Sequence, residues 1–318
     1  MRVVSRADDV RTARRAVTGI AGLVPTMGAL HAGHIALVRA SRAECDHTAV
    51  SIFVNPAQFD DRGDLDAYPR DLDRDLDLLA REGADLVWTP PPEEVYPAGF
   101  QTYVQVRELS RPLEGTARHD HFTGVATVVT KLLLLFAPRR AYFGRKDAQQ
   151  LAVVRRLTAD LGLPVTIVGC PTVRTTDGLA LSSRNELLSD RGRRRATALY
   201  RGLQAAGHAW LRGERRREML LRLARGPIIG AGVELEYLSL ADADSLRELP
   251  DNVHAPRALL SLAARVEGVR LIDNVMLPDD VAPHPAPGGA ECPDHLRTGT
   301  VGPSGAEREP AACCSAST

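Results

Sequence analysis

The chain has 318 residues, of which 44% are hydrophobic and 25% charged, the balance of an ordinary soluble protein with room for two modest domains. Forty basic residues offset forty acidic ones, so the charge gives no support to nucleic acid as the main partner. No apolar stretch approaches the roughly 20 residues that span a bilayer, and residues 1–10 lack the apolar segment of a signal peptide, so we expect a cytoplasmic protein with no membrane partner.

Strand and helix patterns alternate along the first half of the chain. Short apolar runs that stop at Gly, Pro or Asn predict buried strands, and leucines at helical spacing predict helices between them. In chain order we predict a strand ending at 23–25, a helix from about 33, a strand at 48–54, a helix at 68–81, a strand at 84–88, a helix at 122–136, a strand at 140–143, a helix at 148–161 and a strand at 165–169. This alternation predicts an α/β fold with a Rossmann-like parallel sheet over residues 1–172.

The pattern changes after about residue 172. An Arg-rich helix is predicted at 190–212, and strands are predicted at 233–240, 258–265 and 269–272. Residues 173–277 therefore form a predicted smaller α+β domain. From 278 to 318 the chain is rich in Pro, Gly, Ala and Ser, with almost no large apolar residue to offset the entropy of ordering, so we predict a disordered tail.

The segment PTMGALHAGH carries the strongest chemical signal. It places His31 and His34 where a strand ends and a helix begins. The free N–H groups and positive dipole end of a helix N-terminus favour phosphate, and imidazoles there can donate hydrogen bonds as negative charge builds up. The alternative interpretation is a pair of ordinary surface histidines on a loop.

The segment FGRKDAQQ is the second signal, and it also joins a strand to a helix. Lysine occurs in this chain only at Lys131 and Lys146, and a compact ammonium at Lys146 suits the β- and γ-phosphates of a nucleotide. Asp147 either caps the helix or helps to hold a metal ion. Gln150 lies one turn further on and faces the same way as Lys146.

Weaker signals come from three other segments. The run LSSRN (181–185) offers hydroxyls and an Arg for phosphate contacts that form on closure, although Ser-Ser-Arg is also a common helix start. Gln58 follows a strand, at the sheet edge where ligands bind in open α/β folds. The acidic run at 71–77 is more typical of a solvated helix face than of a magnesium site, so Asp75 is only a weak metal candidate.

Together these segments resemble the pantothenate synthetase family from about residue 24 to 274. The matching pieces are PTMGALHAGH, SIFVNPAQF, DLDAYPRDLDRDL, HFTGVATVV, YFGRKDAQQ, DGLALSSRN and RLIDN. The resemblance implies a nucleotidyl-transferase sheet domain, a smaller domain that closes over the ligands, and a homodimer. It also implies an ATP-dependent, amide-forming ligase: pantoate attacks the α-phosphate of Mg-ATP, and β-alanine then displaces AMP from the pantoyl adenylate to give pantothenate, a precursor of coenzyme A.

The resemblance also implies residue roles. The catalytic residues would be His34, as proton donor, with His31, Lys146 and Arg184. The remaining ATP contacts would be Met27, Gly28, Ala29, Leu30, Ala32, Gly33, Gly144, Arg145, Asp147, Val173, Leu181, Ser182 and Ser183. Gln58 and Gln150 would bind pantoate and β-alanine, and Mg²⁺ would accompany ATP.

The chain departs from the family pattern at a few positions. An acidic residue is usual at Ala32, Glu at Arg145, an aromatic residue at Ala148, Glu at Thr175 and Met at Leu181. These departures leave open an alternative, a divergent ligase that joins a different hydroxy acid and amine. A nucleotide-binding regulator without turnover is disfavoured, because no implied phosphate-contacting side chain is missing.

Overall fold

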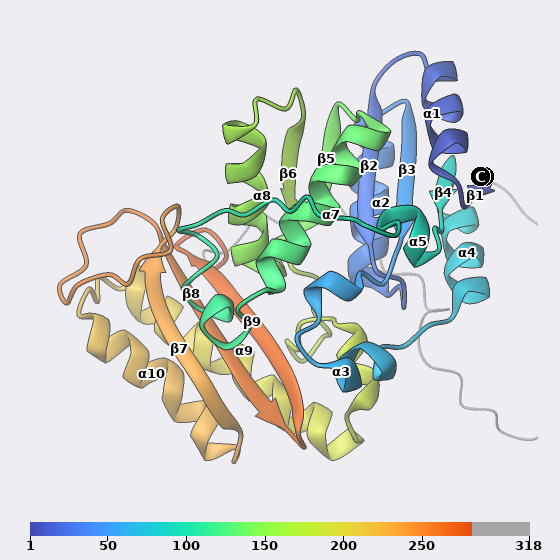
Figure 1. The fold of residues 1–318 in the computed structure, drawn as a ribbon. Coiled ribbons are helices and arrows are strands. Elements are labelled where there is room, and N and C mark those ends of the chain that lie inside the picture. The colour runs from blue at the N-terminus through green and yellow to red at the C-terminus, as the bar shows by residue number, and fades with distance from the viewer. Residues whose placement is uncertain (282–318) are drawn as a thin grey trace, which may run out of the picture. The chain divides into compact units, whose positions relative to one another are not determined.

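Six parallel strands form the larger of the two sheets in residues 1–281, the part of the chain that the computed structural model describes (Figure 1). They are β1 (Arg2–Val4), β2 (Ala21–Thr26), β3 (His47–Ile52), β4 (Leu86–Trp88), β5 (Arg140–Gly144) and β6 (Thr166–Cys170). Across the sheet their order is β1-β4-β3-β2-β5-β6, and every neighbouring pair is parallel. The predicted parallel α/β sheet is confirmed. Of its six strands, only the short edge strand β1 was not predicted.

Helices cover both faces of this sheet. On one face pack α1 (Ala7–Ala16), α7 (His121–Phe136) and α8 (Ala148–Asp160); on the other pack α2 (Ala32–Glu44) and α4 (Leu72–Arg81). Leu23 and Ala141 belong to the hydrophobic cluster that includes α1, α7 and α8. Their chain neighbours Val24 and Tyr142 belong to the cluster that includes α2 and α4. Successive side chains of a strand point to opposite faces, so a sheet covered on both sides needs apolar residues at every strand position.

Short elements complete this part of the chain. They are η1 (Pro56–Gln58), α3 (Arg62–Ala67), α5 (Pro92–Val95), α6 (Glu114–Ala117), η2 (Arg145–Asp147) and η3 (Ser183–Leu187). Of the helices in residues 1–281, none has the length and apolarity needed to cross a membrane.

The position of β2 decides where a ligand can bind. It lies between β3 and β5, so the chain leaves β2 toward one side of the sheet and later returns on the other side. Such a switch point opens a crevice at the carboxyl ends of the two diverging strands. The loop that follows β2 and the turn η2 that follows β5 therefore lie at the same edge.

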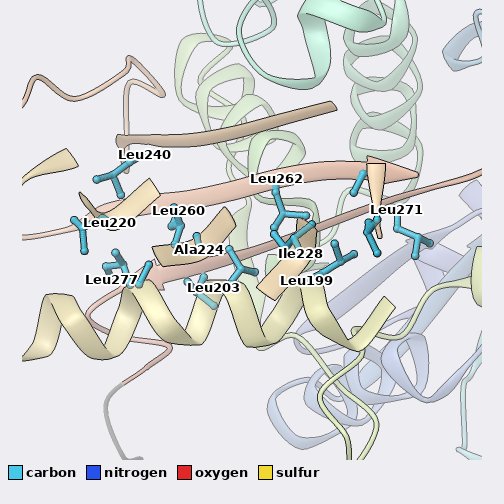
Figure 2. Close-up of a cluster of buried hydrophobic side chains, with 14 of the residues drawn as sticks. Leu199, Leu203, Leu220, Ala224, Ile228, Leu240, Leu260, Leu262, Leu271 and Leu277 are labelled. Carbon is cyan, nitrogen blue, oxygen red and sulfur yellow. The ribbon is translucent and has the colours of Figure 1, made fainter. Parts of the chain in front are cut away.

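The second sheet is antiparallel and packs on two helices. Its strands are β7 (Glu234–Asp242), β8 (Ala258–Val266) and β9 (Val269–Leu277), and its helices are α9 (Asp190–Leu211) and α10 (Arg217–Gly230). Figure 2 shows the shared core, in which leucines of all three strands meet Leu203 of α9 and Ile228 of α10. Helix α10 was not predicted, because Arg residues and the pair Gly226-Pro227 interrupt its apolar pattern. The two sheets lie on opposite sides of the predicted boundary at 172/173, and a division into two domains there stays a prediction.

Residues 278–281, which the sequence analysis placed in the tail, are folded. A carboxylate oxygen of Asp280 accepts a hydrogen bond from the backbone N–H of Met276 at 2.8 Å, and Val281 packs against the core of the second sheet. The folded part therefore extends at least to Val281. The rest of the predicted tail, 282–318, lies outside the described residues.

Helix α7 approaches the turn that carries Gln58 so closely that only glycine fits at position 124. A Cβ atom there would lie 2.1 Å from the carbonyl oxygen of Ala57 and 2.7 Å from the backbone N of Gln58. We expect Gly124→Ala to lower the free energy of unfolding by about 1–3 kcal/mol through overpacking, measured by urea denaturation.

Gly230→Ala is the matched control for this change. Gly230 ends α10, and a Cβ there would have no atom within 4 Å. The control should change the free energy of unfolding by less than about 0.5 kcal/mol. Equal effects of the two substitutions would contradict the close packing inferred at Gly124.

Candidate active site

A cavity of about 930 Å³ lies at the carboxyl ends of β2 and β5. This volume is at the upper end of the range of ligand pockets, which is enough for a nucleotide and a small acid. Most of the residues predicted to bind substrate line it: Met27, His31, Gly33, His34, Gln58, Gly144, Lys146, Asp147, Gln150, Val173, Leu181, Ser182, Ser183 and Arg184. Segments far apart in the sequence are thus brought to one place.

Five residues of the implied ATP site, Gly28, Ala29, Leu30, Ala32 and Arg145, do not line this cavity. The first two have positive φ angles, +84° and +50°, which turn the chain sharply after β2. Leu30 is buried, and its backbone N–H donates to Asp75 at 2.8 Å. Gly28, Ala29 and Leu30 thus shape the loop that presents the histidines.

Asp75 has a place in the structure that favours anchoring over metal binding. Its side chain is only 1% exposed, and one carboxylate oxygen accepts the hydrogen bond from Leu30. Burial raises the pKa of this carboxyl group. Residues 1–281 contain no cluster of three or more His, Cys, Asp or Glu side chains that could hold a metal ion by itself.

The two histidines form a reciprocal cap at the start of α2. The Nδ1 atom of His31 accepts from the backbone N–H of Gly33 at 3.1 Å, and the Nδ1 atom of His34 accepts from the backbone N–H of His31 at 3.3 Å. The ring centroids lie 4.1 Å apart. A Cβ at Gly33 would lie 2.8 Å from the nearest atom of the His31 ring, so glycine is what lets the ring fold over its own helix end.

Burial keeps both imidazoles neutral at neutral pH. It lowers the pKa of His31 to about 3, with further lowering by the charges of His34 and Lys146. It lowers the pKa of His34 to about 4, and Lys146 adds to the effect. Because each Nδ1 already accepts a backbone N–H, each neutral ring carries its proton on Nε2. The site therefore offers two neutral N–H donors beside the Lys146 ammonium.

Lys146 and Arg145 point to different surroundings although they are adjacent in η2. Lys146 lines the cavity, is 18% exposed, and has its Nζ atom 3.6 Å from a carboxylate oxygen of Asp147. Asp147 stands at the N-cap of α8 but makes no side-chain capping bond. The Arg145 guanidinium instead donates to the carbonyl of Gly169 at 3.1 Å and pairs with Asp280 at 3.5 Å.

The segment with two serines and an Arg lines the same cavity as Lys146. Arg184 pairs with Asp64 of α3, with the closer N–O distance 3.0 Å. The Ser182 hydroxyl caps η3 by accepting from the backbone N–H of Arg184 at 3.3 Å. The Ser183 hydroxyl lies 3.5 Å from the hydroxyl of Tyr68. Cation and hydroxyls are thus presented together at the start of one short helix.

The two glutamines also line the cavity. Gln58 is 8% exposed; its Oε1 atom accepts from Asn55 at 3.0 Å, and its Nε2 atom donates to the Met27 sulfur at 3.2 Å. The Gln150 side chain makes no hydrogen bond to any of residues 1–281. It is therefore free to bind a polar group of a ligand.

Among the cavity residues for which no role was predicted are Glu114, Arg118 and His121. The carbonyl of Gln58 accepts hydrogen bonds from Arg118 at 2.9 Å and from the His121 Nδ1 at 2.8 Å. Burial, and then Arg118, lower the pKa of His121 to about 4. Only His121 lies in a segment that the sequence analysis singled out, since it opens the block HFTGVATVV. Glu114 and Arg118 lie in an aperiodic segment, and the sequence does not show where such a segment runs in the fold.

Comparison with known proteins gives this arrangement a family. Residues 2–276 match the family described as pantoate-beta-alanine ligase. The chain belongs to this family. That assignment confirms the resemblance drawn from the motifs and makes the protein a ligase that forms an amide bond.

Relatives of the pantoate–β-alanine ligase family align along nearly the whole described part. The pantothenate synthetase of Roseiflexus sp. (strain RS-1) is 53% identical over 279 residues, covering 87% of this chain and 99% of that protein. The crystal structure of the pantothenate synthetase of Thermus thermophilus superposes with a TM-score of 0.82 at 46% identity, covering 89% of this chain and all of that one. The Francisella tularensis ligase, crystallised with beta-gamma ATP and β-alanine, has a TM-score of 0.71 at 33% identity, covering 87% of this chain and 97% of that one.

The departures from the ligase pattern fall mostly outside the chemistry of the cavity. Arg145, the charge reversal, is directed to Gly169 and Asp280, and it does not line the cavity. Ala32 does not line it either. Ala148 and Leu181 do line it, where they contribute apolar surface. The Thr175 hydroxyl bonds to Asp177 within its own turn.

The neutral histidines predict a specific dependence of stability on pH. Their folded-state pKa values lie below the unfolded value of 6.5, so between pH 6.5 and about 4 the unfolded chain binds more protons. The free energy of unfolding should therefore fall as the pH falls through this window. His34→Gln should flatten that fall, measured by urea denaturation across the window. Equal pH slopes for wild type and variant would contradict the neutral, buried state of His34.

Proposed function

We propose that the chain condenses pantoate with β-alanine at the expense of ATP, through a pantoyl adenylate, and releases AMP and pyrophosphate. The observation that carries this proposal is the convergence of His31, His34, Lys146 and Arg184 on one cavity that also holds Gln58 and Gln150. Phosphate-binding groups and amide side chains for a hydroxy acid thus share one space.

The relatives support pantoate and β-alanine over a different acid and amine. Pantothenate synthetases from several bacteria are about half identical to this chain over most of their length. The Francisella tularensis ligase was crystallised with an ATP compound and β-alanine, which supports the same two ligand classes here. The reversed charge at Arg145, one of the departures that left the alternative open, lies away from the cavity lining.

The first step needs stabilisation of a charge that moves. The pantoate carboxylate attacks the α-phosphorus, a new P–O bond forms, and the bond to the pyrophosphate oxygen breaks. Lys146 can offset the charge that collects on the leaving pyrophosphate, and the Nε2–H groups of His31 and His34 can donate to the phosphate oxygens. In this scheme His34 acts as a neutral hydrogen-bond donor, since its pKa of about 4 leaves it unprotonated at neutral pH.

The residues present fit a Mg²⁺ ion that ATP brings with it. Mg²⁺ at nucleotide sites keeps several waters and takes one or two carboxylates besides the phosphates. Asp147 lines the cavity, is half-exposed, and makes no helix-capping bond that would occupy its carboxylate. We propose Asp147 rather than Asp75 as the carboxylate for this ion, which would neutralise phosphate charge when bound.

The second step needs the mixed anhydride to be kept from water. We propose that residues 173–277 act as a domain that closes over the ligands and so shields the adenylate until the β-alanine amine displaces AMP. Gln58 and Gln150 would hold pantoate and β-alanine for that attack. We also propose that the protein is cytoplasmic, as expected from its sequence, and that it forms a homodimer, as the family resemblance implies.

Isotope exchange tests the proposed function. With ATP, Mg²⁺ and pantoate, the protein should exchange labelled pyrophosphate into ATP, and omission of β-alanine should not prevent it. Other short hydroxy acids serve as the comparison panel. Exchange that requires the amine would overturn the two-step route, and exchange with an acid other than pantoate would favour the divergent ligase.

Lys146→Ala tests the role assigned to the ammonium in the same assay. Losing one preorganised contact to the developing charge costs about 3 kcal/mol, or roughly a hundredfold in rate. Lys146→Arg should recover only part of this, because a planar guanidinium does not replace a compact ammonium.

Lys131→Ala is the matched control. The Lys131 ammonium lies on α7, 4.5 Å from the centroid of the Phe100 ring, and it does not line the cavity. Its loss should leave exchange unchanged. Wild-type exchange by Lys146→Ala would contradict the assigned role.

A further inference from the structure

The loop that carries Lys146 is held from outside its own sheet. Asn274 lies on β9 of the antiparallel sheet and is 6% exposed. Its Nδ2 atom donates to the carbonyl oxygens of Arg145, at 3.1 Å, and of Lys146, at 2.6 Å. An Asn amide has two N–H groups, and both are used here. Because both partners are carbonyl acceptors, only the nitrogen of the amide can face them.

Asn274 itself is fixed by a buried ionic pair. Its backbone N–H donates to Asp273 at 2.8 Å, and its backbone carbonyl accepts from Arg174 at 3.2 Å. Arg174 and Asp273 form two parallel N–H···O bonds of 2.7 and 2.8 Å, and the Asp273 side chain is 3% exposed. The Arg174 guanidinium also stacks 3.8 Å from the centroid of the Tyr200 ring. A bidentate, stacked and buried pair of this kind has little freedom to move.

This network matters for Lys146 because a lysine side chain is long and rotates freely. The position of its Nζ atom is set by where its backbone lies and by the ion pair with Asp147, at 3.6 Å. Displacement of a reacting group by about 1 Å can cost on the order of a hundredfold in rate. Two hydrogen bonds to consecutive carbonyls, one of them that of Lys146 itself, oppose such a displacement.

We propose that Asn274 is a positioning residue for adenylation, which acts on the reaction through Lys146. The proposal rests on the function proposed above. Asn274 touches the backbone of the loop rather than the cavity: it is absent from the cavity lining, whereas Lys146 is part of it. Its contribution should therefore appear in the rate of adenylate formation rather than in the binding of pantoate.

Single-turnover adenylate formation, followed by pyrophosphate release in the presence of ATP, Mg²⁺ and pantoate, tests the proposal. Asn274→Ala should lower this rate about 10- to 100-fold, with the KM for pantoate changed by less than about twofold. In a Lys146→Ala background the same substitution should cost less than about twofold more, because a side chain that is gone cannot be misplaced. This lack of additivity is the readout that a general loss of packing would not give.

Two further variants keep the test decisive. Asn274→Asp has nearly the same size but turns oxygens toward the two carbonyls. It should therefore lower the adenylation rate as much as Asn274→Ala does. A thermal melt reports whether this variant folds. Ser239→Ala is the control on the same sheet, since it breaks a hydrogen bond to Glu248 that has no connection to the loop. It should leave the adenylation rate unchanged in both backgrounds.

The possible outcomes separate this inference from the proposed function. If the wild type forms no adenylate from pantoate, the proposed function fails. The inference is tested separately, in a wild type that forms adenylate and a Lys146→Ala variant that forms it slowly. If Asn274→Ala then lowers the adenylation rate by the same factor with and without Lys146, or lowers it in neither background, Asn274 does not act through Lys146. Either result overturns the inference.

Discussion

The parallel pairing of β2 with both β3 and β5 is the constraint on which the site depends. Gly22 and Leu23 of β2 lie beside Arg140 and Ala141 of β5, so the two strands run in register toward the same edge of the sheet. The loop with the histidines leaves one strand, and the turn with Lys146 leaves the other. Without that register, residues more than a hundred positions apart in the chain would not line one cavity.

Burial at this edge of the sheet leaves the two imidazoles neutral next to a charged ammonium. The imidazoles of His31 and His34 lose their positive charge because they are desolvated next to Lys146. A cluster of three cations would repel itself in the absence of ligand. Two neutral donors beside one ammonium avoid that cost and keep the N–H groups available for the phosphate contacts that we propose. The positive charge of Arg184, in turn, is offset by its ion pair with Asp64.

The sequence predicted the parts of the site that sit at the ends of regular elements. The histidines, Lys146 and Gln58 each follow an apolar run that stops abruptly, and the structure brings all of them to the cavity. It could not predict contacts made between elements far apart. Nothing near Arg145 in the chain shows that its side chain turns to Asp280, and nothing near Asn274 shows that it reaches the Lys146 loop. Such contacts depend on how the two sheets pack, which local patterns do not encode.

We propose that this cavity activates a carboxylate by joining it to the α-phosphate of ATP. Pantoate labelled with oxygen-18 in its carboxylate tests that claim most directly, with AMP and pyrophosphate analysed by mass spectrometry after reaction with ATP and β-alanine. Attack on the α-phosphorus followed by displacement of AMP leaves one labelled oxygen in AMP and none in pyrophosphate. Label in pyrophosphate or in inorganic phosphate, or AMP without label, would contradict the account.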